Sequence, residues 1–255
     1  MELTLRIDPR FNGPPRSGNG GYVCGAMALS TPGIGRVRLY EPPPLATELR
    51  LVPTDEGVGL FEGETLIGEG WPDRLQLEPP RPPGFEEACE AARAFRGFEA
   101  HPLPTCFVCG PDRAEGDGLR LFPGPLADGR LFATPWIPDA SLALDPASRA
   151  VGPAVASAAR PGSEVDPIFV WSALDCPGCF AFPQPPGALV LLGELSARID
   201  GPVLVGRRHV VASWSIEHSG RKHVTGTALF DEDGRCLGLA RAIWIEVSPD
   251  RTDPG

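Results

Sequence analysis

Lysine is almost absent from this 255-residue chain, in which Lys222 is the only lysine and the other basic residues are arginines. Acidic residues outnumber basic ones by 33 to 23, so the formal net charge is −10. A surface that binds nucleic acid needs an excess of positive charge. The charge balance therefore argues against nucleic acid as a partner.

Long apolar runs are also missing. No stretch approaches the roughly 20 apolar residues that span a bilayer, so we expect no membrane partner. Residues 1–6 lack the long apolar core of a secretion signal, and seven cysteines without such a signal suggest reduced thiols. These absences predict a soluble cytoplasmic protein.

Glycine and proline are abundant, with 31 residues each, and they punctuate many short alternating segments. This pattern is typical of antiparallel strands joined by turns. Strands are predicted at residues 3–7, 37–40, 48–52, 58–61, 66–69, 119–122, 130–136, 188–199, 203–217, 223–231 and 236–247.

A short apolar helix is predicted directly after Asn19. The Asn19 side chain is a favourable N-cap. Gly20 and Gly21 then expose bare N–H groups at the positive end of the helix dipole, where another group can approach closely. Residues 22–27 leave no wide polar face, which indicates a buried helix.

A second buried helix is predicted at residues 166–176. Asp166 is its cap and Pro167 its first helical residue, and both types are favoured at those positions. We expect Pro177 to end it, because the residue before a proline is pushed out of helical geometry. A third, amphipathic helix is expected at residues 85–95, after a proline-rich linker.

The chain thus repeats one order of predicted elements: a strand, a buried helix and several antiparallel strands. This repeat predicts an α+β fold with two units facing each other. We place the first domain at residues 1–80, a linker with a short helix at 81–103, and the second domain at 104–255.

Three stretches carry a resemblance to a known family. They are the loop and helix with the Gly20-Gly21 pair, the segment Cys106-Phe107-Val108-Cys109-Gly110 with Gly118-Leu119-Arg120-Leu121 downstream, and the final hairpin ending at residues 240–245. Together with the repeat, they resemble a tandem of hot-dog domains of the thioesterase-like superfamily. In that fold each antiparallel sheet wraps around one central helix.

The resemblance implies where a site would lie. In hot-dog thioesterases that use an aspartate, the helix begins with two small residues whose amides polarise the thioester carbonyl. An aspartate about two turns along belongs to the site across the interface. Here Ala28 stands eight residues after Gly20, whereas Asp175 stands eight residues after Pro167, which has no N–H. The resemblance therefore implies one composite site, with amides from the first helix and the acid from the second.

The implied activity is hydrolysis of an acyl-CoA or related acyl thioester, without a cofactor. Asp175 would activate water or attack directly, and the amides of Gly20 and Gly21 would hold the oxyanion. The residues that we expect to contact substrate are Ser17, Asn19, Tyr22, Trp171 and Ser172. By analogy with other hot-dog proteins, a homodimer is expected.

Other interpretations stay open. Asp175 can simply accept hydrogen bonds from the turn that follows it, and Asn19, Gly20 and Gly21 can be a capped helix with close packing. The alternative function is a non-catalytic protein that binds an acyl or other hydrophobic ligand. A hot-dog dehydratase is a weaker third possibility, because no Asp and His pair stands at a helix entry.

The cysteine pairs Cys106/Cys109 and Cys176/Cys179 raise the question of a four-thiolate zinc site. The first pair is typical of a metal knuckle, but the second follows a packed helix. A redox pair would need its first cysteine at a helix N-terminus. We therefore predict buried reduced thiols that act as small hydrophobic residues, and no metal site.

Overall fold

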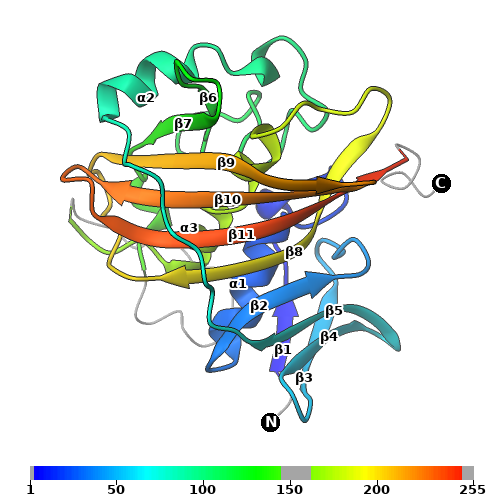
Figure 1. Ribbon diagram of the computed structural model, residues 1–255. Helices are drawn as coiled ribbons and strands as arrows, with labels where there is room; N and C mark the ends of the chain where they lie inside the picture. Colours follow the sequence, from blue (N-terminus) through cyan, green and yellow to red (C-terminus); the bar gives the residue numbers. More distant parts are fainter. Residues whose placement is uncertain (1–2, 145–161, 249–255) are drawn as a thin grey trace.

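One antiparallel sheet of eleven strands runs through the protein, in the order β1-β3-β4-β5-β2-β8-β11-β10-β9-β7-β6 (Figure 1). The computed structural model describes residues 3–144 and 162–248. The strands are β1 (Leu3–Arg6), β2 (Ile34–Leu39), β3 (Glu48–Pro53), β4 (Val58–Glu62), β5 (Thr65–Pro72), β6 (Gly124–Pro125), β7 (Leu131–Trp136), β8 (Leu189–Ile199), β9 (His209–Ser219), β10 (Lys222–Asp231) and β11 (Cys236–Val247).

The first half of the sheet, β1 to β5, packs on helix α1 (Gly20–Ser30). The Asn19 side chain caps this helix by accepting a hydrogen bond from Tyr22 N at 2.9 Å, as its sequence predicts. Val23, Cys24 and Met27 are fully buried. The helix has no polar face because neighbours cover most of it, with Leu29 near its end left exposed.

The second half of the sheet packs on helix α3 (Pro167–Ala173), which Asp166 caps by accepting a hydrogen bond from Ile168 N at 3.0 Å. This helix ends at Ala173, so the prediction that Pro177 ends it is wrong. The backbone of Asp175 leaves helical geometry, with φ −87° and ψ −89°. A 3₁₀ turn, Cys176–Phe180, then contains Pro177. The turn points the Asp175 side chain back toward α1.

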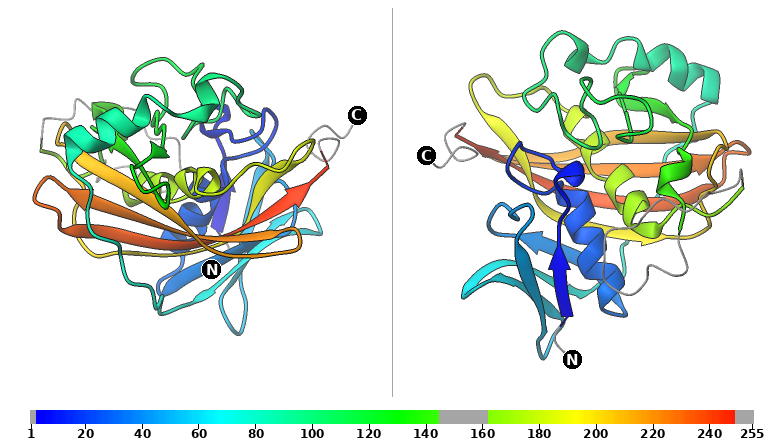
Figure 2. Two further views of the ribbon diagram at one scale, coloured as in Figure 1. Left: turned by 45° about the horizontal axis from the view of Figure 1, so that its top comes forward. Right: turned by 180° about the vertical axis from the view of Figure 1, so that it is seen from behind.

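The two halves meet in the sheet and also in the layer of helices. Strands β2 and β8 pair in the middle of the sheet, with Arg38 opposite Glu194. The sheet curves around α1 and α3, which lie side by side in its hollow (Figure 2). A Cβ added at Gly25 of α1 would lie 2.8 Å from Cβ of Trp171 in α3, so a glycine is needed for this contact. The α+β prediction is confirmed, and the proposed domain limits stay a prediction because the sheet is continuous.

The segment between the halves crosses the sheet on the face opposite to α1 and α3 (Figure 1). Leu75 and Leu77 pack there on residues of β9, β10 and β11. Helix α2 (Phe85–Ala92) follows and packs mainly on β7. None of the helices in residues 3–144 and 162–248 is long and apolar enough to cross a membrane.

Two predicted strands differ from the structure. Residues 119–122 form no strand, because Leu119 N and Leu121 N donate hydrogen bonds to Phe107 O and Val108 O of a loop. Strand β9 begins at His209 rather than at residue 203. The residues before it pair instead with the entry to α3, where Val165 N donates to Val203 O.

Candidate functional site

The Asp175 carboxylate lies at the junction of the two central helices. Its Oδ2 accepts a hydrogen bond from Gly21 N at 2.9 Å and a second one from Asn19 Nδ2 at 3.2 Å. Asp175 comes from the turn after α3, whereas Asn19 and Gly21 open α1. The residue is only 2% exposed. The acid that follows α3 thus lies against the N-terminus of α1, the helix of the other half of the molecule.

Burial controls the protonation of this acid. It raises the pKa of Asp175 to about 7, against the opposing effect of the hydrogen bond from the Gly21 amide. The second oxygen, Oδ1, is buried and has no hydrogen-bond partner among the described residues. A carboxyl group that titrates near neutral pH and keeps one oxygen free is suited to accept a proton.

The two glycines of α1 serve different purposes. A Cβ added at Gly21 would lie 2.5 Å from Cβ of Asp175 and 2.9 Å from Trp171 O, so only glycine permits this close approach. Its amide is already engaged by Asp175. The first amides of a helix have no intrahelical acceptor. No hydrogen bond to Gly20 N occurs within residues 3–144 and 162–248, which leaves this amide as a free donor.

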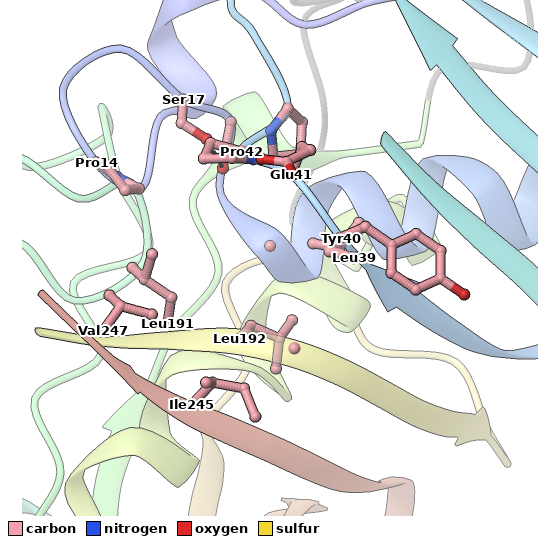
Figure 3. Close-up of a pocket in the computed structure, with 14 residues that line it drawn as sticks. Pro14, Ser17, Leu39, Tyr40, Glu41, Pro42, Leu191, Leu192, Ile245 and Val247 are labelled. Carbon is pink, nitrogen blue, oxygen red and sulfur yellow. Dashed lines mark hydrogen bonds between the residues drawn. The ribbon is translucent and has the colours of Figure 1, made fainter. Parts of the chain in front are cut away.

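A cavity of about 140 Å³ opens beside Gly20 (Figure 3). Side chains from β2, β8 and β11 and from the loops around Ser17 and Pro42 surround it. Its lining consists of Pro14, Ser17, Gly18, Gly20, Leu39, Tyr40, Glu41, Pro42, Pro43, Leu191, Leu192, Gly193, Ile245 and Val247. Glu41 is the one charged residue in this lining. Asp175 does not reach the cavity, whose wall is chiefly apolar.

Leu192 separates the cavity from the helix junction. A Cβ added at Gly20 would lie 2.7 Å from Leu192 Cδ2, which shows how closely this side chain covers the start of α1. Leu192 and the other apolar residues of the lining were not predicted from the sequence. Leu192 belongs to a run of large apolar residues in β8 that is partly exposed in the structure. The sequence pattern alone does not show which apolar residues of a strand are exposed.

The structure places the five expected substrate-contact residues in different surroundings. Ser17 lines the cavity, and Asn19 binds Asp175. Tyr22 stacks on Phe11 with ring centroids 4.3 Å apart. Trp171 and Ser172 are buried in the contact between the helices, and Ser172 Oγ donates to Ile168 O of its own helix at 2.9 Å.

Three cysteines meet behind Asp175. Cys106 Sγ lies 3.7 Å from Cys176 Sγ, and the Sγ atoms of Cys106, Cys109 and Cys176 all lie within 4.8 Å of one another. Hydrogen bonds from the other two thiols lower the pKa of Cys106, and backbone amides of Val108 and Cys109 add to the effect. The Sγ of Cys176 is also 3.7 Å from Asp175 Oδ2.

Comparison with known proteins identifies the fold. No family model and no curated protein matches the sequence. Among solved structures, the tesB protein of Mycobacterium avium subsp. paratuberculosis matches with a TM-score of 0.56 at 12% identity, over 96% of this chain and 93% of that one. A hot-dog protein of unknown function from Alicyclobacillus acidocaldarius matches with a TM-score of 0.51 at 10% identity, over 97% and 94% of the two chains. This chain has the double hot-dog fold.

A further neighbour is a Thermobifida fusca protein described as a putative thioesterase II. It matches with a TM-score of 0.53 at 13% identity, over 96% of this chain and 92% of its own. Structural matches at such low identity establish the fold alone, and the chemistry has to be argued from the site. The expected resemblance to tandem hot-dog proteins is confirmed.

Proposed function

We propose that this double hot-dog protein is a thioesterase-like hydrolase of an acyl-CoA or related acyl thioester, with one site at the junction of α1 and α3. The observation that carries the proposal is the buried Asp175 carboxylate on the Gly21 amide, 2.9 Å away. A burial that raises the pKa of an acid, next to a helix N-terminus with a free amide, is a combination suited to acyl transfer.

In this proposal the Gly20 and Gly21 amides have separate roles. The N–H of Gly21 holds Asp175, and the N–H of Gly20 donates to the thioester carbonyl oxygen. In one route, water attacks the carbonyl carbon while Asp175 Oδ1 accepts its proton; the carbon–sulfur bond then breaks, and the thiol leaves with that proton. In the other route, Oδ1 attacks the carbon itself and the carbon–sulfur bond breaks to release a thiolate, which takes its proton from solvent. Water then cleaves the resulting anhydride, which releases the acid and restores the Asp175 carboxylate. One oxyanion donor of this kind lowers the barrier by roughly 3 kcal/mol.

The pseudo-symmetric position at the opposite ends of the helices lacks both groups. There the start of α3 is Pro167, which has no N–H to donate. Ala28, in α1, stands where an acid would be needed. This asymmetry supports one site per chain rather than two.

The apolar cavity beside Gly20 supports a short acyl chain as the group that enters it. The cavity has a volume of about 140 Å³ and a mostly apolar wall, which suits a small apolar group. Because Asp175 is 2% exposed, substrate has to displace Leu192 to reach the carboxylate.

Thiol release from a series of short-chain acyl-CoA esters tests the proposal. We expect release by the native protein, and loss of at least 100-fold in kcat for Asp175→Asn with the fold retained. The matched control is Asp166→Asn at the other end of α3, where asparagine still caps the helix. Turnover that survives Asp175→Asn, or that falls equally in both variants, would remove Asp175 from the mechanism.

The second candidate is a non-catalytic protein that binds a hydrophobic acyl ligand. The burial of Asp175 behind Leu192, away from the cavity, favours this alternative. Acyl-CoA binding measured by calorimetry, with no thiol released over hours and the same affinity in Asp175→Asn, would support it.

A further inference from the structure

Three of the seven cysteines form a cluster that the proposed hydrolysis does not use. Cys106 and Cys109 come from the loop before β6, and Cys176 comes from the turn after α3. All three are buried. A lone buried cysteine is commonly a small hydrophobic residue. Three that bring their sulfur atoms together from segments 70 residues apart need another explanation.

The spacing of the sulfur atoms fits a tetrahedral metal ion. With Zn–S bonds of about 2.3 Å, two thiolates of a tetrahedral site lie about 3.8 Å apart. The observed distance between Cys106 Sγ and Cys176 Sγ is 3.7 Å, and Cys109 Sγ lies within 4.8 Å of both. The Cys106–Cys176 pair therefore has ligand spacing, and the third sulfur atom lies close to it.

A polar side chain also faces the sulfur atoms. Asn19 Nδ2 points at two of the sulfur atoms, 3.4 Å from Cys176 Sγ and 4.0 Å from Cys106 Sγ. Donors aimed at sulfur stabilise its negative charge and fix the orientation of the ligand. Soft thiolate ligands select zinc over magnesium or calcium.

We infer that Cys106, Cys109 and Cys176 hold a zinc ion that ties the turn after α3 to the Cys106–Gly110 loop. This revises the expectation of inert thiols. The objection that Cys176 belongs to a packed helix does not hold, because α3 ends at Ala173 and Cys176 begins the 3₁₀ turn. Cys179 turns away, with its Sγ 3.8 Å from Gln184 Nε2, so three thiolates are assigned.

The inference bears on the hydrolase proposal, because Cys176 Sγ lies 3.7 Å from Asp175 Oδ2 and a zinc ion on that thiolate would favour the ionised form of the Asp175 carboxyl. A zinc ion at this position would fix the turn that carries Asp175, since Cys176 is the next residue. The same ion would stiffen the protein whether the neighbouring site turns over an ester or only binds one.

Metal content of the full chain tests the inference. The protein should be purified under reducing conditions, without a chelator or a histidine tag. Its metal content should then be measured by inductively coupled plasma mass spectrometry. We expect about one zinc ion per chain. Cys106→Ser should reduce this to near zero, whereas Cys236→Ser, at a cysteine outside the cluster, should keep it.

A second measurement covers the case in which Cys106→Ser fails to fold. Cobalt(II) added to metal-free native protein should give a thiolate-to-cobalt charge-transfer band that zinc abolishes. His218→Ala should leave this band unchanged, because His218, His223 and Glu246 form a separate group on the sheet. The inference would be overturned if native protein with all its thiols reduced bound neither zinc nor cobalt. It would also be overturned if Cys106 and Cys176 formed a disulfide instead of binding metal.

Discussion

Gly21→Ala is the substitution that probes the helix junction most sharply. On an exposed helix, alanine in place of glycine adds about 1 kcal/mol of stability. At this position the new Cβ would lie 2.5 Å from Cβ of Asp175, 2.9 Å from Trp171 O and 3.0 Å from Cα of Ser172. Two of these three atoms are backbone, so α1 has to move away from α3.

The size of the effect follows from three contributions. Overpacking costs about 1–3 kcal/mol, and the weakened hydrogen bond to a buried carboxylate costs about 1.5–3 kcal/mol, while helix propensity returns about 1 kcal/mol. We therefore expect a net loss of about 1.5–5 kcal/mol in the free energy of unfolding. Urea unfolding followed by tryptophan fluorescence and circular dichroism measures it.

Gly20→Ala is the matched control, one residue earlier in the same helix. Its closest contact is the flexible end of Leu192, at 2.7 Å, so a side-chain shift relieves much of the clash. It should cost clearly less than Gly21→Ala. If Gly21→Ala is as stable as the native protein, the close contact between Asp175 and the start of α1 is refuted.

Two further predictions concern the sheet seam and a buried histidine. Arg38 Nη2 lies 2.6 Å from Glu194 Oε2 where β2 meets β8, and Glu194 is buried. Arg38→Leu leaves the buried Glu194 without its partner and should therefore destabilise the protein. The loss should be only about 1–2 kcal/mol, because half of the Arg38 side chain is exposed and solvent screens the pair. The double variant Arg38→Leu with Glu194→Leu should recover part of that loss in urea unfolding; no recovery would show that the pair is not coupled. Burial lowers the pKa of His209, so the stability associated with its neutral form is fully present above the unfolded pKa of about 6.5 and should fall as pH drops below it. His209→Gln should make that fall shallower, and an unchanged pH profile would exclude this histidine as a cause.

Local sequence features predicted the central elements of the fold. The caps Asn19 and Asp166 and the apolar helices that follow them are encoded within a few residues each, and both occur in the structure. The repeat of strand, helix and strands indicated two similar halves. The resemblance to hot-dog thioesterases implied that the start of α1 and Asp175 would meet, since each half lacks what the other provides.

Long-range geometry was not readable from the sequence. Cys106 and Cys176 are 70 residues apart, and nothing local shows that the loop before β6 reaches the turn after α3. Residues 119–122 alternate like a strand, yet tertiary contacts use their amides in a loop. The cavity beside Gly20 depends on the register in which β2, β8 and β11 pair, which the pattern of each strand leaves undetermined.

A crystal structure with a non-hydrolysable acyl-CoA analogue tests the central claim most directly. The account predicts the acyl carbonyl oxygen within about 3 Å of Gly20 N, with Asp175 Oδ1 facing the carbonyl carbon and Leu192 displaced. An analogue seated at the start of α3, near Pro167, or on the outer face of the sheet would contradict it.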